Sequence, residues 1–308
     1  MADARGGESA SVGAFGKHPA WNDHIEDIGL DSERLVLAKR SIYIEGIGGN
    51  IDSGAWDGLE QSARVDGFDH TLLWSFENEW LLGRMWSSSD GKGRTKYPMS
   101  IVAHARHVPV EAATDAIAII ENAEAKCKAT SDRQAVIDAL GAARAAFREL
   151  AAKDRDEAPH RADLSPLITS SDLGPELVGL ERVFYQIHRD MSAYLKGTDA
   201  EGTTSRIKSV DLRPQHIRVP ACIEGTLPSL LAWRDLLGEL LDAACPILVI
   251  RRGASQWIDI IIGAPGVAQF FCLRAGTSAV PPATVVPYTI DPELSGRVRR
   301  WAADRGAH

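Results

Sequence analysis

Imidazole and carboxylate side chains gather in the first quarter of the chain. His18, Asp23 and His24 fall within seven residues, and His70 follows in a more apolar segment. Such side chains are common ligands of zinc and other borderline metals. Their spacing matches no regular helix or strand period, and Asp and His side chains in loops also form local hydrogen bonds with the backbone. We therefore expect no metal site, with a metal-dependent enzyme built on these four residues as the alternative function.

Two short segments match catalytic or phosphate-binding motifs in letters only. Ser89 and Lys92 have the spacing of the S-x-x-K pair of penicillin-recognising enzymes, but the S-D-N and K-T-G motifs are absent. The segment 91–94, Gly-Lys-Gly-Arg, lacks the glycine spacing and the following Ser or Thr of a Walker loop. The chain contains no G-x-S-x-G, H-E-x-x-H or G-x-G-x-x-G motif. We expect no catalytic residue and no cofactor.

Charge and hydropathy restrict the class of partner. The 308 residues include 34 Lys and Arg against 42 Asp and Glu, a net charge of −8. Nonspecific nucleic-acid binding depends on a positive field, so we expect no nucleic-acid partner. The longest apolar run is about seven residues, well below the roughly 20 of a membrane span, so we expect no membrane insertion. Residues 1–10 lack the apolar core of a signal peptide and are expected to form a disordered tail.

The four cysteines favour a reducing compartment. They lie far apart and form no C-x-x-C pair, which disfavours both a zinc site and a disulfide framework. Cys245 and Cys272 stand in apolar segments, where a free thiol behaves as a small hydrophobe. We expect Cys127, Cys222, Cys245 and Cys272 to be unpaired and the protein to be cytoplasmic.

Alternating and apolar segments predict strands in the first third of the chain. A glycine-rich strand over Ser11–Gly16 precedes a helix that Asp31 caps and that ends at the Gly48-Gly49-Asn50 break. A hairpin, with its turn at Glu77-Asn78, is predicted next. It consists of strands over 71–76 and 80–86, and it is followed by a polar loop over 87–96 and a strand over 97–104 that starts near Pro98.

The middle of the chain is predicted to be helical and the end to combine a helix with strands. Helices are expected over Glu111–Lys128, from a capping box of Ser131 and Gln134 onward, and over Pro175–Leu195. In the last third, Thr226 is expected to cap a helix before a meander of three short strands. These strands are predicted over 247–250, 257–262 and 269–273.

Strands at both ends of the chain with helices between them predict the fold class. We expect a layered α/β sandwich, in which a mixed sheet is assembled from both ends of the chain and carries helices on its faces. The expected organisation is one domain over 11–308. Its three parts are an N-terminal part over 11–105, a helical middle segment over 106–205, and a C-terminal helix and strand meander over 206–308.

The loop after the first predicted strand combines glycine, proline and charge. Gly13 and Gly16 bracket Phe15, which predicts a turn in which Phe15 is buried and Lys17 remains in water. Pro19 is expected to stiffen the loop. These residue types indicate a shaped loop on a rigid scaffold, where binding residues concentrate.

A second loop has similar chemistry. Asp90, Lys92 and Arg94 lie on a glycine-flexed segment that returns to the sheet at Tyr97-Pro98. Asp23 of the first loop can receive backbone N–H groups. Asp23 or Asp90 can also pair with Arg94 and pin the two loops together. We expect the loops over 17–23 and 90–94 to lie close together at one edge of the sheet.

The two loops carry a family resemblance. The segment 12–23, V-G-A-F-G-K-H-P-A-W-N-D, resembles the N-terminal signature of the TagF (ImpM-like) family of bacterial type VI secretion. The segment 88–99, S-S-D-G-K-G-R-T-K-Y-P-M, is similar to a later motif of that family, with one extra residue before the aromatic. The resemblance covers about residues 11–105 and extends to the last third only as layout. Asn22-Asp23-His24 stands where the family usually has Gly-Asp-Phe, the helical middle is longer, and no phosphatase domain is appended.

The resemblance implies a function. Members of this family are regarded as non-enzymatic α/β sandwich proteins of the cytoplasm. Some repress secretion after translation by acting on a forkhead-associated scaffold protein. The resemblance therefore implies a non-catalytic accessory or regulatory protein that works by protein–protein contact. A structural component of the same secretion machine is another alternative. The candidate partner-binding residues are Lys17, Trp21, Asp23, Asp90, Lys92, Arg94 and Tyr97, and the residues expected to shape the loops are Gly13, Phe15, Gly16, Pro19 and Pro98.

Overall fold

The fold is built on one seven-stranded sheet. The structure, a computed structural model, describes residues 9–153, 164–169, 178–190 and 213–306. The strand order is β1-β4-β3-β2-β6-β7-β5, and each ladder among these strands is antiparallel. The strands are β1 (Ala10–Gly16), β2 (Asp69–Ser75), β3 (Glu79–Ser87), β4 (Pro98–Arg106), β5 (Gln215–Pro220), β6 (Ile247–Arg252) and β7 (Trp257–Ile262).

The predicted layered α/β fold is confirmed, and both ends of the chain contribute strands as expected. The strand directions are not mixed, however, because the neighbouring strands meet in antiparallel ladders throughout. The β2–β3 hairpin turns at Glu77-Asn78, closed by a hydrogen bond from the Phe76 N–H to the Glu79 carbonyl at 2.8 Å. A tight turn of this kind reverses the chain and can only join antiparallel strands.

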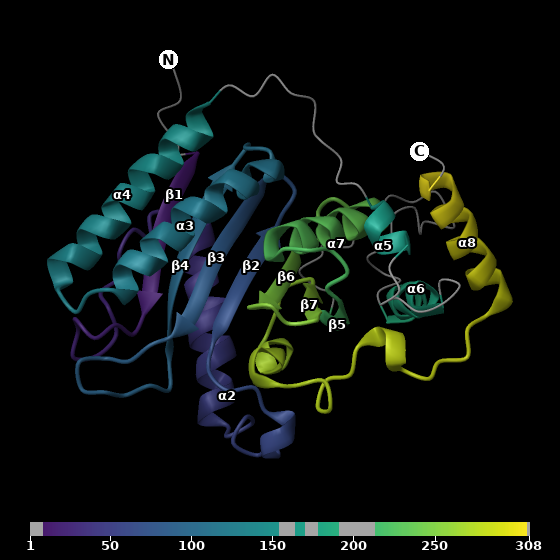
Figure 1. Cartoon of the computed structure of the whole chain (residues 1–308), viewed down its shortest axis with the longest axis horizontal. Coiled ribbons are helices and arrows are strands. Elements are labelled where there is room, and N and C mark those ends of the chain that lie inside the picture. Colours follow the sequence, from purple (N-terminus) through teal and green to yellow (C-terminus); the bar gives the residue numbers. More distant parts are fainter. Residues whose placement is uncertain (1–8, 154–163, 170–177, 191–212, 307–308) are drawn as a thin grey trace.

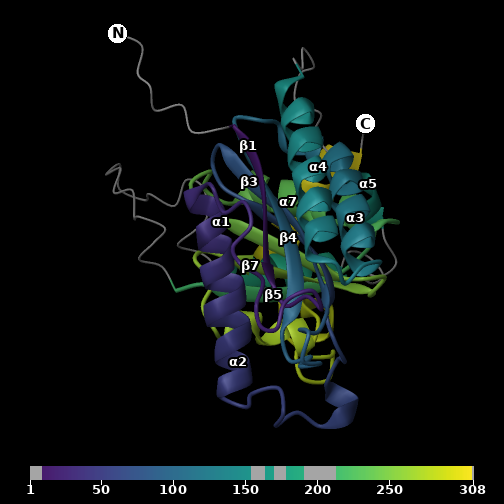
Figure 2. The same cartoon turned by 90° about the vertical axis from the view of Figure 1, so that its left-hand side faces the viewer.

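Helices cover both faces of the sheet, and Figure 2 shows the three layers edge-on. The helices are α1 (Glu33–Ala38), a π-helix (Lys39–Gly48), α2 (Gly49–Asp52), α3 (Ala113–Lys128), α4 (Arg133–Ala152), α5 (Ser165–Thr169), α6 (Val178–Asp190), α7 (Thr226–Leu240) and α8 (Pro292–Gly306). Short 3-10 turns lie at Gln61–Ala63, Val110–Ala112, Gln269–Arg274 and Ala283–Val285.

Alternation along the strands supplies two hydrophobic cores. On β2, Leu73 points to the layer that contains α3, α4 and α7, whereas Leu72 and Trp74 point to the layer of α1, the π-helix and α2. The first core continues into α6 and α8, which lie beyond the β5 edge of the sheet in Figure 1. The sheet is therefore buried on both faces. Exposed polar side chains that could bind a partner are found at the ends of its strands.

The first helix differs from the prediction at both ends. Ser32, and not Asp31, is the N-cap, because its side chain accepts a hydrogen bond from the Leu35 N–H. The expected break at Gly48-Gly49-Asn50 does not occur, and helical backbone continues to Asp52. A side chain on Gly46 would collide with the ring of Phe270. The glycines of this region thus allow close packing of the 3-10 segment Gln269–Arg274.

The last third contains three further corrections. The segment predicted as a strand over 269–273 is that 3-10 helix, Gln269–Arg274. The strand that pairs with β7 on the side away from β6 is β5, which sequence analysis missed because its centre carries the charged Arg218. Helix α8 was also not predicted. At the other end of the chain, Ala10 belongs to β1 and not to a tail. Residues 1–8, the ends of the predicted helix over 175–195 and the boundary near 205 lie outside the described residues.

None of the four cysteines forms a disulfide, as predicted, and Cys127, Cys245 and Cys272 are buried. Burial raises the pKa of the Cys127 thiol to about 11, so this thiol stays protonated at neutral pH. Among the helices in the described part of the chain, none combines the length and the apolar character that crossing a membrane requires.

The N-terminus of α4 provides a test of helix capping. Asp132, and not the predicted Ser131, is the N-cap, and its carboxylate accepts the Ala135 N–H at 2.8 Å. We expect Asp132→Ala to lower the free energy of unfolding by about 1 kcal/mol and Ser131→Ala to change it by less than about 0.5 kcal/mol. Urea denaturation of both variants measures this difference, and equal losses would contradict the assignment.

Candidate interaction site

The loops after β1 and β3 meet, as predicted. The Gly91 N–H donates to the Trp21 carbonyl at 2.6 Å, and Arg94 Nη2 donates to the Asn22 carbonyl at 2.9 Å. The two loops are about 70 residues apart in the chain but adjacent in space, because β1 and β3 both flank β4. The predicted proximity of the two loops is therefore confirmed.

Asp90 is the centre of this contact. Its Oδ2 accepts hydrogen bonds from Lys17 Nζ and from Arg94 Nε, both at 2.6 Å. Its Oδ1 accepts the backbone N–H groups of Lys92 and Arg94, both at 3.0 Å. The residue is only 2% exposed. A buried carboxylate is tolerable only when its oxygens are satisfied in this way.

The surroundings of Asp90 favour its ionised form. Removal from water raises the carboxyl pKa, but the Lys17 ammonium and the N–H donors of Lys92 and Arg94 outweigh that effect. The pKa of Asp90 therefore lies well below its ordinary value. The site keeps a fixed negative charge between two cations over the whole physiological pH range.

Besides Asp90, two more of the candidate residues are buried. Lys17, expected to remain in water, is 3% exposed, because its ammonium group is drawn inward by Asp90. Trp21, one of the candidate partner-binding residues, is 7% exposed, and the Arg133 guanidinium lies 5.4 Å from the centroid of its ring. These two residues hold the loops from inside and cannot themselves present a broad contact surface to a partner.

The exposed part of the network consists of Asp23, Lys92 and Arg94. One Asp23 carboxylate oxygen lies 3.2 Å from Arg94 Nη2, 3.0 Å from His24 Nδ1 and 3.8 Å from Lys17 Nζ. Arg94 is half exposed, and its guanidinium joins the buried Asp90 to the exposed Asp23. The predicted pairing of Arg94 with either aspartate is confirmed, since it pairs with both.

The glycines and prolines hold the backbone of the site. Gly16 has φ +123°, and a side chain there would collide with the carbonyl oxygen of Pro98. Close contact is needed because the Lys17 N–H donates to that same carbonyl at 3.0 Å. Gly13 faces Leu30 and Leu35, and Phe15 is fully buried in the second core. Pro19 lies in the turn between His18 and Trp21.

An apolar pocket adjoins the charged loops, and sequence analysis missed it. The pocket measures about 230 Å³ and includes Gly16, His24, Tyr43 and Ile44 in its lining. The rings of His24, Tyr43 and Tyr97 lie within 5.4–5.7 Å of one another, so the predicted Tyr97 borders the same region. Ile44 is 55% exposed although it is a large hydrophobe on a helix. An exposed isoleucine on a helix indicates a contact site. The sequence does not show that Ile44 is exposed, because this depends on which side of the helix packs against the core.

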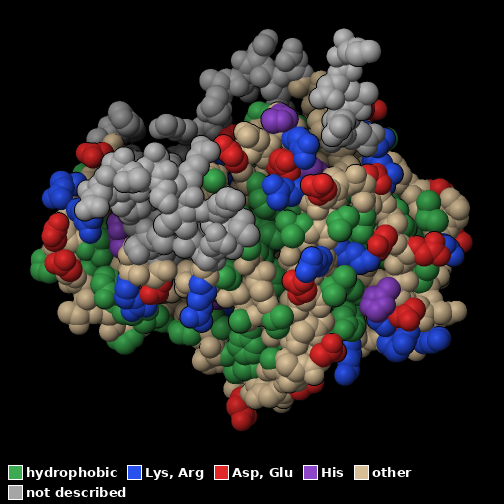
Figure 3. Space-filling view, turned by 180° about the vertical axis from the view of Figure 1, so that it is seen from behind, with side chains coloured by type: hydrophobic (Ala, Val, Ile, Leu, Met, Phe, Trp, Pro, Cys, Tyr) green, Lys and Arg blue, Asp and Glu red, His purple; other side chains and the backbone are tan. Residues whose placement is uncertain are grey.

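Hydrophobic side chains are otherwise scattered on this side. In the view from behind, Figure 3 shows them among interspersed acidic and basic side chains. Val36, Ile44, Val267 and Val285 are the large hydrophobics that are strongly exposed in the described residues. Of these, Ile44 is the one that lines the pocket beside the charged loops.

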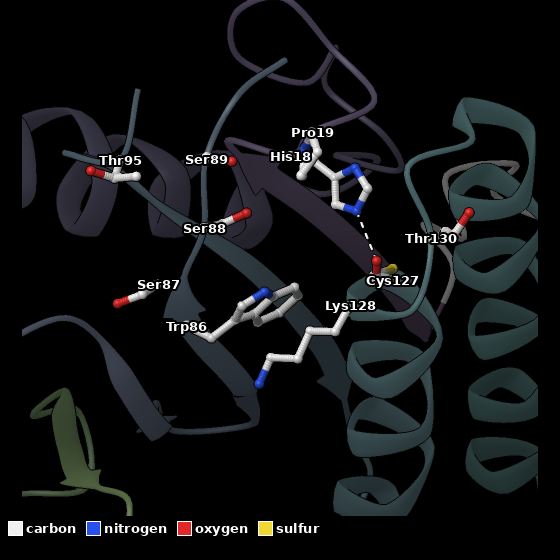
Figure 4. A pocket seen from close by; sticks show the side chains of 10 residues that line it. All are labelled: His18, Pro19, Trp86, Ser87, Ser88, Ser89, Thr95, Cys127, Lys128 and Thr130. Atoms are coloured by element: carbon white, nitrogen blue, oxygen red, sulfur yellow. Dashed lines mark hydrogen bonds between the residues drawn. The ribbon is translucent and has the colours of Figure 1, made fainter. Parts of the chain in front are cut away.

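His18, one of the histidines considered as a metal ligand, is held by partners within the protein. His18 is buried and uses both ring nitrogens, since Nε2 contacts the Cys127 carbonyl at 2.8 Å and Nδ1 accepts the Ala20 N–H at 3.1 Å. These partners fix the neutral Nε2–H tautomer. Figure 4 shows the ring directed at the end of α3, beside a pocket of about 370 Å³. The role of His18 is thus to tie the first loop to α3.

His70 is also buried, on β2, and burial lowers its pKa to about 4, which keeps it neutral. Among the described residues, three possible ligands come together elsewhere, at His216, Asp259 and Cys272. There Arg218 occupies both Asp259 oxygens, at 2.8 and 2.9 Å. A guanidinium in this position competes with a cation, so we interpret the group as a buried ion-pair network.

Comparison with known protein families and with curated proteins found no match for this chain.

The buried Lys17–Asp90 pair is tested by a matched lysine substitution. We expect Lys17→Ala to lower the melting temperature by about 4 °C or more, because it leaves the Asp90 carboxylate buried with one cation fewer. Lys92 lies on the same loop system but is exposed and contributes only its backbone N–H to Asp90. Lys92→Ala should therefore change the melting temperature by less than about 1 °C. Equal effects of the two substitutions in differential scanning calorimetry would contradict a buried pair.

The lowered pKa of Asp90 makes a prediction for acid stability. Because the folded protein holds this proton less tightly than the unfolded chain, the stabilisation is complete above the ordinary aspartate pKa and is lost as the pH falls below it. We expect Asp90→Asn to be less stable than the unsubstituted protein at about pH 6, and the difference to shrink towards about pH 2.5. Urea denaturation across this range measures it. If the difference in unfolding free energy between the two proteins stayed constant over this pH range, it would contradict the lowered pKa of Asp90.

Proposed function

We propose that this chain is a non-catalytic accessory protein of a type VI secretion system, which acts in the cytoplasm through protein–protein contacts. The observation that supports the proposal is that the two segments that resemble the TagF (ImpM-like) family lie together in space. Residues from 12–23 and from 88–99 share one hydrogen-bond network around the buried Asp90. The residues behind the resemblance are therefore a spatial unit and not two unrelated matches.

This unit has the properties of a pre-organised contact surface. The buried Lys17 and Asp90 fix the backbone, so that Asp23 and Arg94 are presented on rigid loops. Loops fixed before binding lose less conformational entropy when a partner binds. The apolar pocket with Tyr43 and Ile44 lies directly beside these charges. In protein–protein interfaces, the residues that contribute most of the binding energy are often aromatic residues and arginines around a small apolar centre.

The partner that the resemblance implies is a forkhead-associated scaffold protein of the secretion apparatus. Such contact would repress or otherwise regulate secretion, as in some members of the family. The charged part of the surface combines one exposed carboxylate, Asp23, with the half-exposed Arg94 and the exposed Lys92. A partner with a complementary pair of charges around an apolar side chain fits this arrangement.

The test is a quantitative binding assay with the forkhead-associated scaffold of the same secretion system. We expect Arg94→Ala and Ile44→Asp each to weaken binding at least tenfold, because they remove the exposed guanidinium and place a charge in the apolar pocket. Arg299→Ala is the control for the arginine, since Arg299 is likewise 49% exposed in its side chain and pairs with a buried carboxylate, that of Glu181 on α6. Val285→Asp is the control for the hydrophobe, since Val285 is 61% exposed and does not line the pocket.

Circular dichroism of each variant checks that the fold is kept. Unchanged affinity for both Arg94→Ala and Ile44→Asp would contradict the proposed surface. Equal losses in the test and control variants would show an effect of stability rather than of contact. Absence of any binding by the unsubstituted chain would contradict the proposed partner.

A further inference from the structure

Arg251, near the end of β6, is a buried cation that has no acidic partner among the described residues. It is 9% exposed. Its Nε donates to the Ser255 carbonyl at 3.1 Å, and Nη1 donates to the Gly225 carbonyl at 2.6 Å and the Ser229 hydroxyl at 3.3 Å. All three acceptors are neutral. A guanidinium has five N–H donors, so the two on Nη2 have no partner in the described structure.

The buried Arg218 and the partly buried Arg84 show what is missing. Arg218 is held by both oxygens of Asp259, and Arg84 is held by Asp69 and Glu124, each at 2.7 Å. Burial of a charge is costly unless an opposite charge compensates it. At Arg251 no carboxylate of the described residues does so, and burial lowers the pKa of its guanidinium while leaving it protonated at neutral pH. Within the part of the chain that the structure describes, the positive charge of Arg251 is therefore uncompensated.

Arg251 lines a pocket, which gives this charge access to a ligand. The pocket measures about 390 Å³ and lies between the ends of β5 and β6, the β6–β7 turn and the segment over 277–284. The lining also includes the polar side chains of Gln256, Thr277 and Thr284, which form no side-chain hydrogen bond with other described residues. Trp257 adds an aromatic wall. The lining contains no acidic side chain that would repel an anion.

We propose that this pocket binds a carboxylate group. The site offers a single positive charge, which a monoanion neutralises, and its remaining donors are the Nη2 N–H groups, two hydroxyls and one amide. Guanidinium N–H groups bind carboxylate oxygens strongly and directionally. The carboxylate can belong to a small organic acid or to an acidic side chain of a protein. The pocket is independent of the proposed interaction site, since β5 and β1 form opposite edges of the sheet.

The first experiment uses sodium acetate as the probe, against sodium chloride at equal ionic strength. We expect acetate, and not chloride, to raise the melting temperature of the full chain in a saturable way. Arg251→Met should weaken this response at least tenfold. The substitution removes a buried unpaired charge at similar length, so it should leave the fold intact. Arg252→Met is the matched control, because Arg252 is the next residue, donates to the Asp66 carbonyl and is not among the residues that line the pocket.

The source of the carboxylate is distinguished with a short blocked peptide that contains one Glu, compared with the same peptide containing Gln. Tighter binding of the Glu peptide than of acetate supports a protein side chain, and binding of acetate alone supports a small acid. Arginine side-chain NMR of the unsubstituted protein is a second readout that needs no variant, and the Arg251 signals should shift with acetate. The proposal is overturned if chloride acts like acetate, if Arg251→Met responds like the unsubstituted chain, or if phosphate binds more tightly than acetate.

Discussion

The arrangement of the N-terminal loops depends on the burial of one carboxylate. Asp90 is removed from water, and only the combination of Lys17, Arg94 and two backbone N–H groups makes this burial favourable. Each donor comes from a defined place in the fold, so the carboxylate specifies how both loops leave the sheet. The ends of β1 and β3 are thereby locked together, and Asp23 is positioned by the same guanidinium that satisfies Asp90.

The same electrostatic rule operates at the other edge of the sheet with different results. Arg218 and Asp259 face each other across β5 and β7 and neutralise each other inside the protein. Such a pair contributes to how the edge strand is placed and leaves no charge for a ligand. Arg251, on the neighbouring strand β6, lacks this compensation among the described residues. The contrast between these two arginines separates a structural ion pair from a candidate ligand site.

Local sequence signals predicted most of the secondary structure. The β2–β3 hairpin, the strand that begins at Pro98, and helices α3 and α7 follow from alternation, turn residues and periodic apolar positions. The predictions were wrong where tertiary contacts outweighed local preference. Gly48 and Gly49 indicate a helix end by themselves, but the helix continues because the region packs closely on other segments. Similarly, Gln269–Arg274 has strand-like residues but adopts a 3-10 turn against that helix.

For the candidate site, the sequence by itself determined which residue types are present and that two loops of similar chemistry follow strand ends. It also determined that Gly16 and Pro98 would shape the backbone. Only the tertiary structure decided that Lys17 and Trp21 are buried, because an ammonium group enters the interior only when a carboxylate far away in the chain is already there. The apolar pocket beside Ile44 and the uncompensated charge of Arg251 were likewise decided by tertiary structure. Burial and pairing are properties of contacts between distant segments, and no local pattern encodes them.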